Sequence, residues 1–163
     1  MARLWAPWRM EYIKASASKD PGPCFLCDLP RLKQDRENLI LHRGRKAFVI
    51  LNRFPYNNGH LLVAPYRHVA GMEDLKDAEV TEIWRLADRA RGVLDGEMQP
   101  QGYNLGINLG RAAGAGLPGH IHLHLVPRWN GDTNFMPILG DTKVLPLTLL
   151  QTWDLLARKF AKR

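Results

Sequence analysis

Three histidines alternate with aliphatic residues in the segment HIHLHLV, where they are His120, His122 and His124. In an extended strand successive side chains point to opposite faces, so the three imidazoles are expected on one face and the aliphatic residues on the other. Imidazole changes protonation near neutral pH and can act as a base, a metal ligand or a nucleophile. The chain has six histidines, and three lie here. This favours a chemical role over a surface strand with chance histidines or a metal site without chemistry.

The composition is typical of one ordinary globular domain. The chain has 163 residues, of which 45% are hydrophobic and 24% charged. No apolar run approaches the roughly 20 residues that cross a bilayer, and the N-terminus lacks the apolar stretch of a secretory signal. We therefore expect a cytoplasmic protein without a membrane partner. The formal net charge of +7 is consistent with an anionic partner, but solvated lysines and arginines explain it equally well.

The only two cysteines, Cys24 and Cys27, form a CxxC pair. In a reducing cytoplasm such a pair is either half of a metal site or a redox motif rather than a structural disulfide. A tetrahedral zinc site needs two more ligands, and histidine is the obvious source. The pair alone does not decide between the two readings.

Short runs of β-branched and aromatic residues, bounded by turn residues, predict about five strands. The first two are expected to form a hairpin, and the last two flank a loop rich in glycine and alanine, residues 110–119. The predicted strands are residues 39–42, 46–51, 60–65, 103–108 and 120–127.

Two helices are also predicted. The first begins near Asp77, where acidic residues complement the helix dipole. Its expected core stripe is Val80, Ile83, Trp84, Ala87, Val93 and Leu94. The second lies within residues 145–160, with Leu149, Leu150, Trp153, Leu156 and Ala157 on its apolar side.

An antiparallel sheet with one long central helix and a C-terminal helix indicates an α+β fold in a single domain, residues 1–163. Residues 1–23 are expected to form an N-terminal extension and loop, 24–129 the core of the domain, and 130–163 a loop and the last helix.

The triad segment resembles the signature of the histidine triad (HIT) superfamily, in which histidines alternate with apolar residues. Three further segments resemble that family in the family's order: NRFP beginning at Asn52, GHLLVAP containing His60, and NLGRAAG beginning at Asn108. The resemblance covers residues 24–129. The segments LWAPWR near the N-terminus and PRWNGDTNF after the triad are similar to the bacterial diadenosine tetraphosphate phosphorylase branch.

The resemblance implies nucleotidyl transfer or hydrolysis on dinucleoside polyphosphates. The middle histidine, which matches His122, would attack the α-phosphorus and form a covalent nucleotidyl-histidine intermediate. His124 would contact phosphate oxygens or the leaving group, while His60 and His120 would support the catalytic pair. A neutral imidazole is a competent nucleophile when a hydrogen bond holds its tautomer. Nothing in the residues tells whether water or inorganic phosphate resolves the intermediate.

The resemblance also implies residues that bind the substrate. Asn52 matches a position near the nucleoside, and Asn108 matches one near the phosphate. Gly114 and Gly116 lie in a loop whose small residues let backbone N–H groups approach phosphate oxygens. This loop departs from the family pattern: it is one residue longer, and Leu117 replaces a serine or threonine. The missing hydroxyl argues against phosphoramidate cleavage.

Zinc-containing branches of the family use a CxxC pair, a histidine beyond the strand that follows Gly-His, and the first triad histidine. These positions match Cys24, Cys27, His68 and His120. Four protein ligands form a closed tetrahedral site, so the resemblance implies a structural zinc ion and no organic cofactor. The alternative is a pair of unmetallated cysteines and an ordinary surface His68.

Relatives commonly pair two chains, so the resemblance implies a homodimer. One alternative is a nucleotide-binding regulatory protein with little turnover, against which the intact His122 argues. Another is a hydrolase of other nucleoside monophosphate derivatives, such as phosphoramidates. A protein that removes adenylate from DNA ends is a third, but it usually needs an additional zinc-finger domain, so nucleic acid is not the expected partner.

Overall fold

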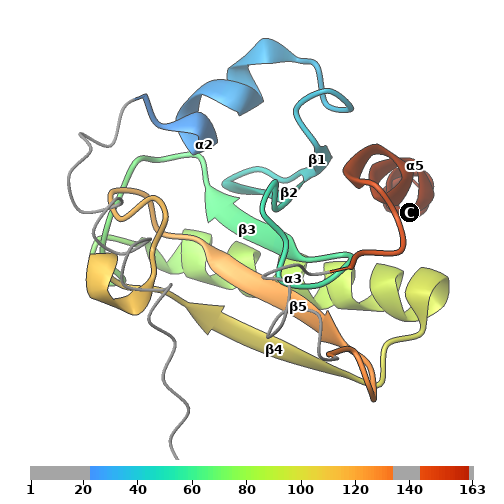
Figure 1. The fold of residues 1–163 in the computed structure, drawn as a ribbon. Coiled ribbons are helices and arrows are strands. Elements are labelled where there is room, and N and C mark those ends of the chain that lie inside the picture. The colour runs from blue at the N-terminus through green and yellow to red at the C-terminus, as the bar shows by residue number, and fades with distance from the viewer. Residues whose placement is uncertain (1–22, 134–143, 162–163) are drawn as a thin grey trace, which may run out of the picture.

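The computed structural model describes residues 23–133 and 144–161. Within them, five strands form one antiparallel sheet in the order β1-β2-β3-β5-β4 (Figure 1). The fold predicted from the sequence is confirmed. The strands are β1 (Ile40–Arg43), β2 (Ala47–Leu51), β3 (Leu61–Pro65), β4 (Gly102–Ile107) and β5 (Leu123–Arg128).

The centre of the sheet is buried on both faces. Every residue of β2 and β3 is buried, as expected for continuous apolar runs covered on both sides. The last strand, β5, inserts between β3 and β4, which places His124 opposite Leu62 and Gly106. His60 immediately precedes β3, so the pairing of β3 with β5 brings two histidines that are far apart in the sequence close together.

The predicted strand at residues 120–127 is shorter than expected at its start. It begins at Leu123, so His120 and His122 precede it. Their segment bonds to loop carbonyls instead of a neighbouring strand: the N–H of His120 donates to Leu117 and that of Ile121 to Val69. Strict alternation holds only within the strand. The prediction that all three histidines lie on one strand is therefore wrong, since only His124 lies on it. The rings of His122 and His124 nevertheless lie side by side, 4.9 Å apart between centroids.

The long helix α3 (Asp77–Met98) begins where the sequence predicts and packs along the sheet. The expected core stripe is wrong at two positions, because Val80 is 38% exposed and Trp84 is 54% exposed. Each residue advances a helix by about 100°, so Trp84 points away from its buried neighbour Ile83. The residues of α3 that form the core are Ile83, Leu86, Ala87, Ala90 and Leu94.

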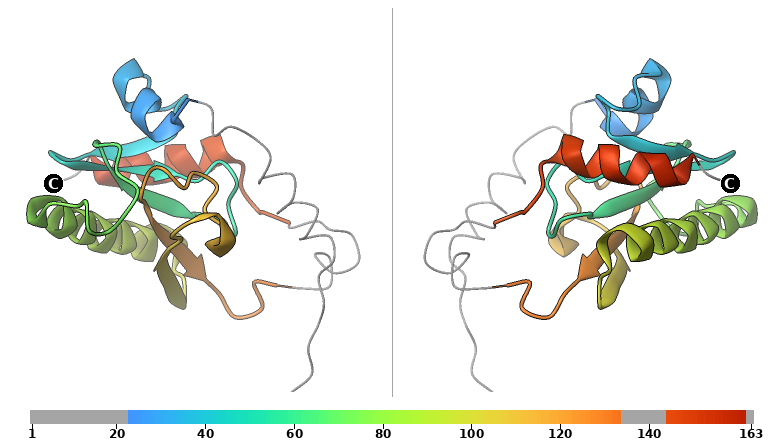
Figure 2. Two further views of the ribbon diagram at one scale, coloured as in Figure 1. Left: turned by 90° about the vertical axis from the view of Figure 1, so that its left-hand side faces the viewer. Right: turned by 90° about the vertical axis from the view of Figure 1, so that its right-hand side faces the viewer.

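The last helix, α5 (Leu149–Phe160), lies beside α3 and β1 (Figure 2). Its Trp153 indole N–H donates to the carbonyl of Ile40 at 2.8 Å, which docks the helix on the edge strand. The predicted apolar side is wrong at Leu150, which is 43% exposed, and correct at Leu156, which is buried together with Phe160.

Three short helical turns were not predicted: α2 (Phe25–Asp28), η1 (Leu29–Leu32) and η2 (Arg111–Ala113). No helix in the described ranges has both the length and the apolar character needed to cross a bilayer. The tryptophan-rich segment near the N-terminus and residues 134–143 of the expected loop lie outside the described residues.

Candidate active site and metal centre

The imidazole of His122 is held in one tautomer by a backbone carbonyl two residues earlier in the chain. Its Nδ1 lies 2.7 Å from the carbonyl oxygen of His120. A carbonyl only accepts, so Nδ1 carries the hydrogen and Nε2 keeps its lone pair. The side chain is buried, and burial lowers the pKa of His122 below its ordinary value. A neutral imidazole with a free Nε2 lone pair is the form that can attack an electrophile.

His60 and His124 form a directed hydrogen-bond pair. Nε2 of His60 lies 2.9 Å from Nδ1 of His124. Nδ1 of His60 lies 3.1 Å from the backbone N of Tyr56. A backbone N–H only donates, so this Nδ1 accepts and the hydrogen of His60 sits on Nε2. His60 therefore donates to His124, whose own hydrogen must sit on its Nε2.

The outer nitrogen of His124 is buried and has no hydrogen-bond partner among the described residues. An unsatisfied buried polar atom in a folded protein points to a missing partner. His124 lines a pocket of about 470 Å³, together with Asn108 and Arg128. A neutral donor at the wall of a pocket fits an acceptor such as a phosphate oxygen.

Burial keeps the pair uncharged. It lowers the pKa of His60 to about 3, with the neighbouring His124 and His122 adding to the effect. It also lowers the pKa of His124 to about 4, with a further contribution from His122. Both rings are neutral near pH 7, so His124 acts as a hydrogen-bond donor rather than as a cation.

The turn before His60 is tied to the end of β5. The Asn57 amide donates to the carbonyl of Pro127 at 3.0 Å and to the carboxylate of Asp132 at 2.7 Å. Asp132 also pairs with Arg128 at 2.6 Å, and this hydrogen bond holds the pKa of the carboxyl far below its usual range. Sequence reasoning missed these residues. Asn57 reads as an ordinary turn residue, and its partners are 70 and 75 positions away.

The substrate residues expected from the resemblance fall in different places. Asn108 lines the pocket beside His124. Asn52 instead turns its amide nitrogen toward Nδ1 of His60, at 3.2 Å. Gly114, which has a φ of +85°, and Gly116 are exposed in the loop that contains η2. Neither glycine is among the residues that line this pocket.

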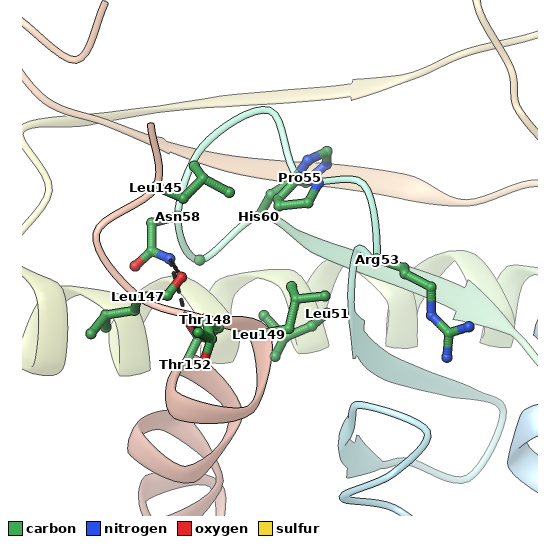
Figure 3. A pocket seen from close by; sticks show the side chains of 11 residues that line it. Leu51, Arg53, Pro55, Asn58, His60, Leu145, Leu147, Thr148, Leu149 and Thr152 are labelled. Atoms are coloured by element: carbon green, nitrogen blue, oxygen red, sulfur yellow. Dashed lines mark hydrogen bonds between the residues drawn. The ribbon is translucent and has the colours of Figure 1, made fainter. Parts of the chain in front are cut away.

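A second pocket, of about 350 Å³, lies between the turn before His60 and the start of α5 (Figure 3). The Asn58 amide nitrogen donates to the carbonyl of Leu147 at 3.1 Å and to the hydroxyl of Thr152 at 3.2 Å. These bonds fasten α5 to the turn that precedes His60.

The four predicted metal ligands are brought together. The ligand atoms of Cys24, Cys27, His68 and His120 all lie within 4.8 Å of one another. Nδ1 of His120 is 3.2 Å from the sulfur of Cys24 and 3.4 Å from that of Cys27, and Nδ1 of His68 is also 3.4 Å from Cys27. A tetrahedral zinc ion, with bonds of about 2.3 Å to sulfur and about 2.0 Å to nitrogen, places the two elements about 3.5 Å apart. The donor set fits such an ion.

Local structure orients these ligands. Nε2 of His120 lies 2.9 Å from the carbonyl of Pro65, which fixes its hydrogen there and turns the Nδ1 lone pair toward the thiols. The turn of α2 closes through bonds from the N–H groups of Cys27 and Asp28 to the carbonyl of Cys24. A Cβ at Gly119 would meet Nε2 of His68 at 3.2 Å, so glycine leaves room for that ring.

Comparison with known protein families matches the HIT domain to residues 33–131. Over its full length the chain is 41% identical to an AP-4-A phosphorylase of Mycobacterium tuberculosis (strain H37Rv) and covers 86% of that protein. It is also 32% identical to a bis(5'-adenosyl)-triphosphatase of Dictyostelium discoideum over 93 residues, covering 57% of this chain and 62% of that protein.

Solved structures share the fold. A histidine triad nucleotide-binding protein from Sulfolobus tokodaii superposes with a TM-score of 0.65 at 24% identity, covering 84% of this chain and 89% of that one. A Zn-bound histidine triad family protein from Mycobacterium smegmatis gives a TM-score of 0.61 at 22% identity and covers 93% of each chain.

Proposed function

The chain belongs to the HIT domain family, and we propose that it is an enzyme that transfers a nucleoside monophosphate from a dinucleoside polyphosphate through His122. The observation that carries the proposal is the pairing of two complementary nitrogens. His122 has a free Nε2 lone pair, and the ring of His124, whose Nε2 carries a hydrogen, lies 4.9 Å away between centroids. The relatives named AP-4-A phosphorylase and bis(5'-adenosyl)-triphosphatase support this substrate class.

The proposed reaction has two steps. In the first, Nε2 of His122 forms a bond to the α-phosphorus, and the bond from phosphorus to the bridging oxygen breaks. With diadenosine tetraphosphate the leaving group is ATP, and Nε2–H of His124 donates to the oxygen that gains charge. In the second, water or phosphate attacks the same phosphorus and the bond to His122 breaks. Water yields AMP and phosphate yields ADP, and the free imidazole returns.

We assign substrate binding to the pocket beside His124. Asn108 offers a neutral amide to phosphate oxygens there. The loop that carries Gly114 and Gly116 would supply backbone N–H groups once the substrate is bound. The role of Asn52 near the nucleoside stays a prediction from the resemblance.

We propose that Cys24, Cys27, His68 and His120 hold a structural zinc ion. The four protein ligands leave no open position, so the ion would contribute folding energy and anchor α2 beside the active site rather than act on the substrate.

We also expect two copies of the chain to associate. β4 is an edge strand of the sheet, and Leu105 on it is 43% exposed. Light scattering tests this, since a monomeric mass would exclude it.

The central experiment is turnover of diadenosine tetraphosphate with and without inorganic phosphate. ADP plus ATP only when phosphate is present identifies a phosphorylase, and AMP plus ATP without phosphate identifies a hydrolase. His122→Ala should abolish both. Unchanged turnover in that variant would refute the nucleophile. Tight nucleotide binding without any turnover in the wild type would favour a regulatory protein, the second candidate.

A further inference from the structure

The proposed reaction requires the hydrogen of the His60 ring to be on Nε2 rather than on Nδ1. Nδ1 of His60 faces the backbone N–H of Tyr56 at 3.1 Å and the side chain of Asn52 at 3.2 Å. Its other nitrogen faces Nδ1 of His124 at 2.9 Å. The position of one hydrogen on His60 therefore decides which nitrogen of His124 carries a hydrogen.

The orientation of the Asn52 amide follows from its second contact. Its Oδ1 accepts the backbone N–H of Phe54 at 3.0 Å, which leaves Nδ2 as the atom that faces His60. Both neighbours of His60 Nδ1 are thus N–H donors, and neither can accept a hydrogen. The Phe54 bond also forms the tight turn that leads the chain toward Tyr56, so Asn52 shapes the loop that supplies the other donor.

We propose that Asn52 is a positioning residue that keeps the hydrogen of His60 on Nε2 and, through it, the hydrogen of His124 on the Nε2 that serves the leaving group. This inference rests on the proposed function and deepens it. It assigns to Asn52 a task that differs from contact with the nucleoside.

The other tautomer of His60 would remove the hydrogen-bond donor that His124 offers to the leaving group. If Nδ1 of His60 carried the hydrogen, its Nε2 would become an acceptor. His124 would then have to place its own hydrogen on Nδ1 to keep the 2.9 Å bond. Its Nε2 would hold a lone pair, and a lone pair repels the developing negative charge of a departing phosphate oxygen.

Burial makes this arrangement depend on direct contacts. His60 is fully buried, and His124 is 8% exposed. Water therefore cannot readily exchange with either contact, and an unmade hydrogen bond at this depth is costly. Asn52 is half-buried and directly follows β2, and its backbone N–H donates to the carbonyl of His60 at 2.9 Å.

The direct test is Asn52→Asp, which keeps the shape and replaces the donor with an acceptor. At about pH 8 a buried histidine stays neutral and an aspartate is ionised, so the carboxylate oxygen that faces His60 gains a hydrogen bond from it only if the hydrogen of His60 moves to Nδ1. Nitrogen-15 NMR of histidine-labelled protein without substrate distinguishes the two tautomers. We expect Nε2–H on His60 and His124 in the wild type and Nδ1–H on both in the variant. Unchanged tautomers in Asn52→Asp would overturn the proposal.

Kinetics separate positioning from nucleoside binding. Loss of a general acid or donor typically costs about 10²-fold or more in rate, so we expect kcat for diadenosine tetraphosphate to fall about 10²-fold in Asn52→Asp with KM unchanged. Asn52→Ala removes the donor without adding an acceptor, and the N–H of Tyr56 remains. It should therefore lose less activity than Asn52→Asp. Equal losses in both variants, or a change in KM alone, would contradict the proposal.

The matched control is Asn130→Asp, which adds the same charge at an exposed position. We expect wild-type tautomers and wild-type kcat. The NMR result needs no substrate, so it stands even if diadenosine tetraphosphate proves to be the wrong substrate. An active enzyme with unmoved tautomers in Asn52→Asp would instead reject the inference and leave the proposed function intact.

Discussion

The Asn57 side chain should contribute substantially to stability, because it donates one hydrogen bond to a distant carbonyl and another to a distant carboxylate. Its amide donates to the carbonyl of Pro127 and to the carboxylate of Asp132, and its side chain is 6% exposed. A neutral hydrogen bond contributes about 0.5 to 1.5 kcal/mol and one to a charged group about 1.5 to 3 kcal/mol. Asn57→Ala should therefore lower the free energy of unfolding by about 3 kcal/mol.

The assay is equilibrium urea unfolding followed by tryptophan fluorescence and circular dichroism, with agreement of the two probes as the test of two-state behaviour. Asn130→Ala is the control, because that side chain is exposed, and exposed substitutions usually stay within about 0.5 kcal/mol. The pairing itself is tested by a double-mutant cycle with Asp132→Asn. Non-additivity of about 0.5 kcal/mol or more is expected for residues in contact.

The same variant should slow the reaction. Asn57 follows Tyr56, whose N–H bonds to His60, so release of the turn should lower kcat as well as stability. A loss of less than about 0.5 kcal/mol in Asn57→Ala, or strict additivity with Asp132→Asn, would refute the reasoning that this network braces the turn.

Cys27→Ser should remove one ligand of the metal set; elemental analysis is expected to find close to one zinc per chain in the wild type and almost none in the variant, with a lower melting temperature. Glu79, bonded to Arg67 at 2.6 Å and to the backbone N–H of Lys76, has its pKa lowered to about 2 from 4.5, chiefly by Arg67. Its contribution is present above the unfolded pKa and lost as the pH falls through the folded one, so the stability gap between wild type and Glu79→Gln should close between about pH 5 and pH 2; a constant gap in pH-dependent urea unfolding would contradict this. Leu94→Ala, at a fully buried position, should lower the free energy of unfolding by about 2 to 5 kcal/mol, measured by urea unfolding. Trp84→Ala should lower it much less, because Trp84 is 54% exposed. Equal losses in the two variants would show that Trp84 belongs to the core after all.

Local patterns predicted the elements of this fold well. Apolar runs between turn residues identified the strands, and the acidic start at Asp77 marked the long helix. What they could not predict was which side of each helix faces the sheet. Trp84 and Leu150 are apolar but exposed, because burial depends on where the sheet lies and not on side-chain type alone. Residual apolar exposure of this kind is normal for a folded chain.

The candidate site was predictable to the extent that its residues carry a signature. The triad, His60 and the four metal-site residues were all predicted as site residues, and the structure brings the metal set together and places His60 beside His124. The direction of the hydrogen bonds was not predictable, because it depends on a backbone N–H at Tyr56 and a carbonyl at His120. Every residue offers a backbone carbonyl and every residue except proline an N–H, so the sequence does not reveal which of these groups will bond to a histidine.

The side chain and the backbone of His120 take part in two different sites. The ring belongs to the sulfur-containing cluster, whereas the main-chain oxygen orients His122. Any amino acid at this position would present that oxygen, so the requirement for histidine arises from the cluster alone. Another metal-binding side chain at position 120 should therefore keep the carbonyl that orients His122, provided that the backbone stays anchored. Of the three histidines of the motif, His120 would then be the one whose side chain the proposed reaction requires least.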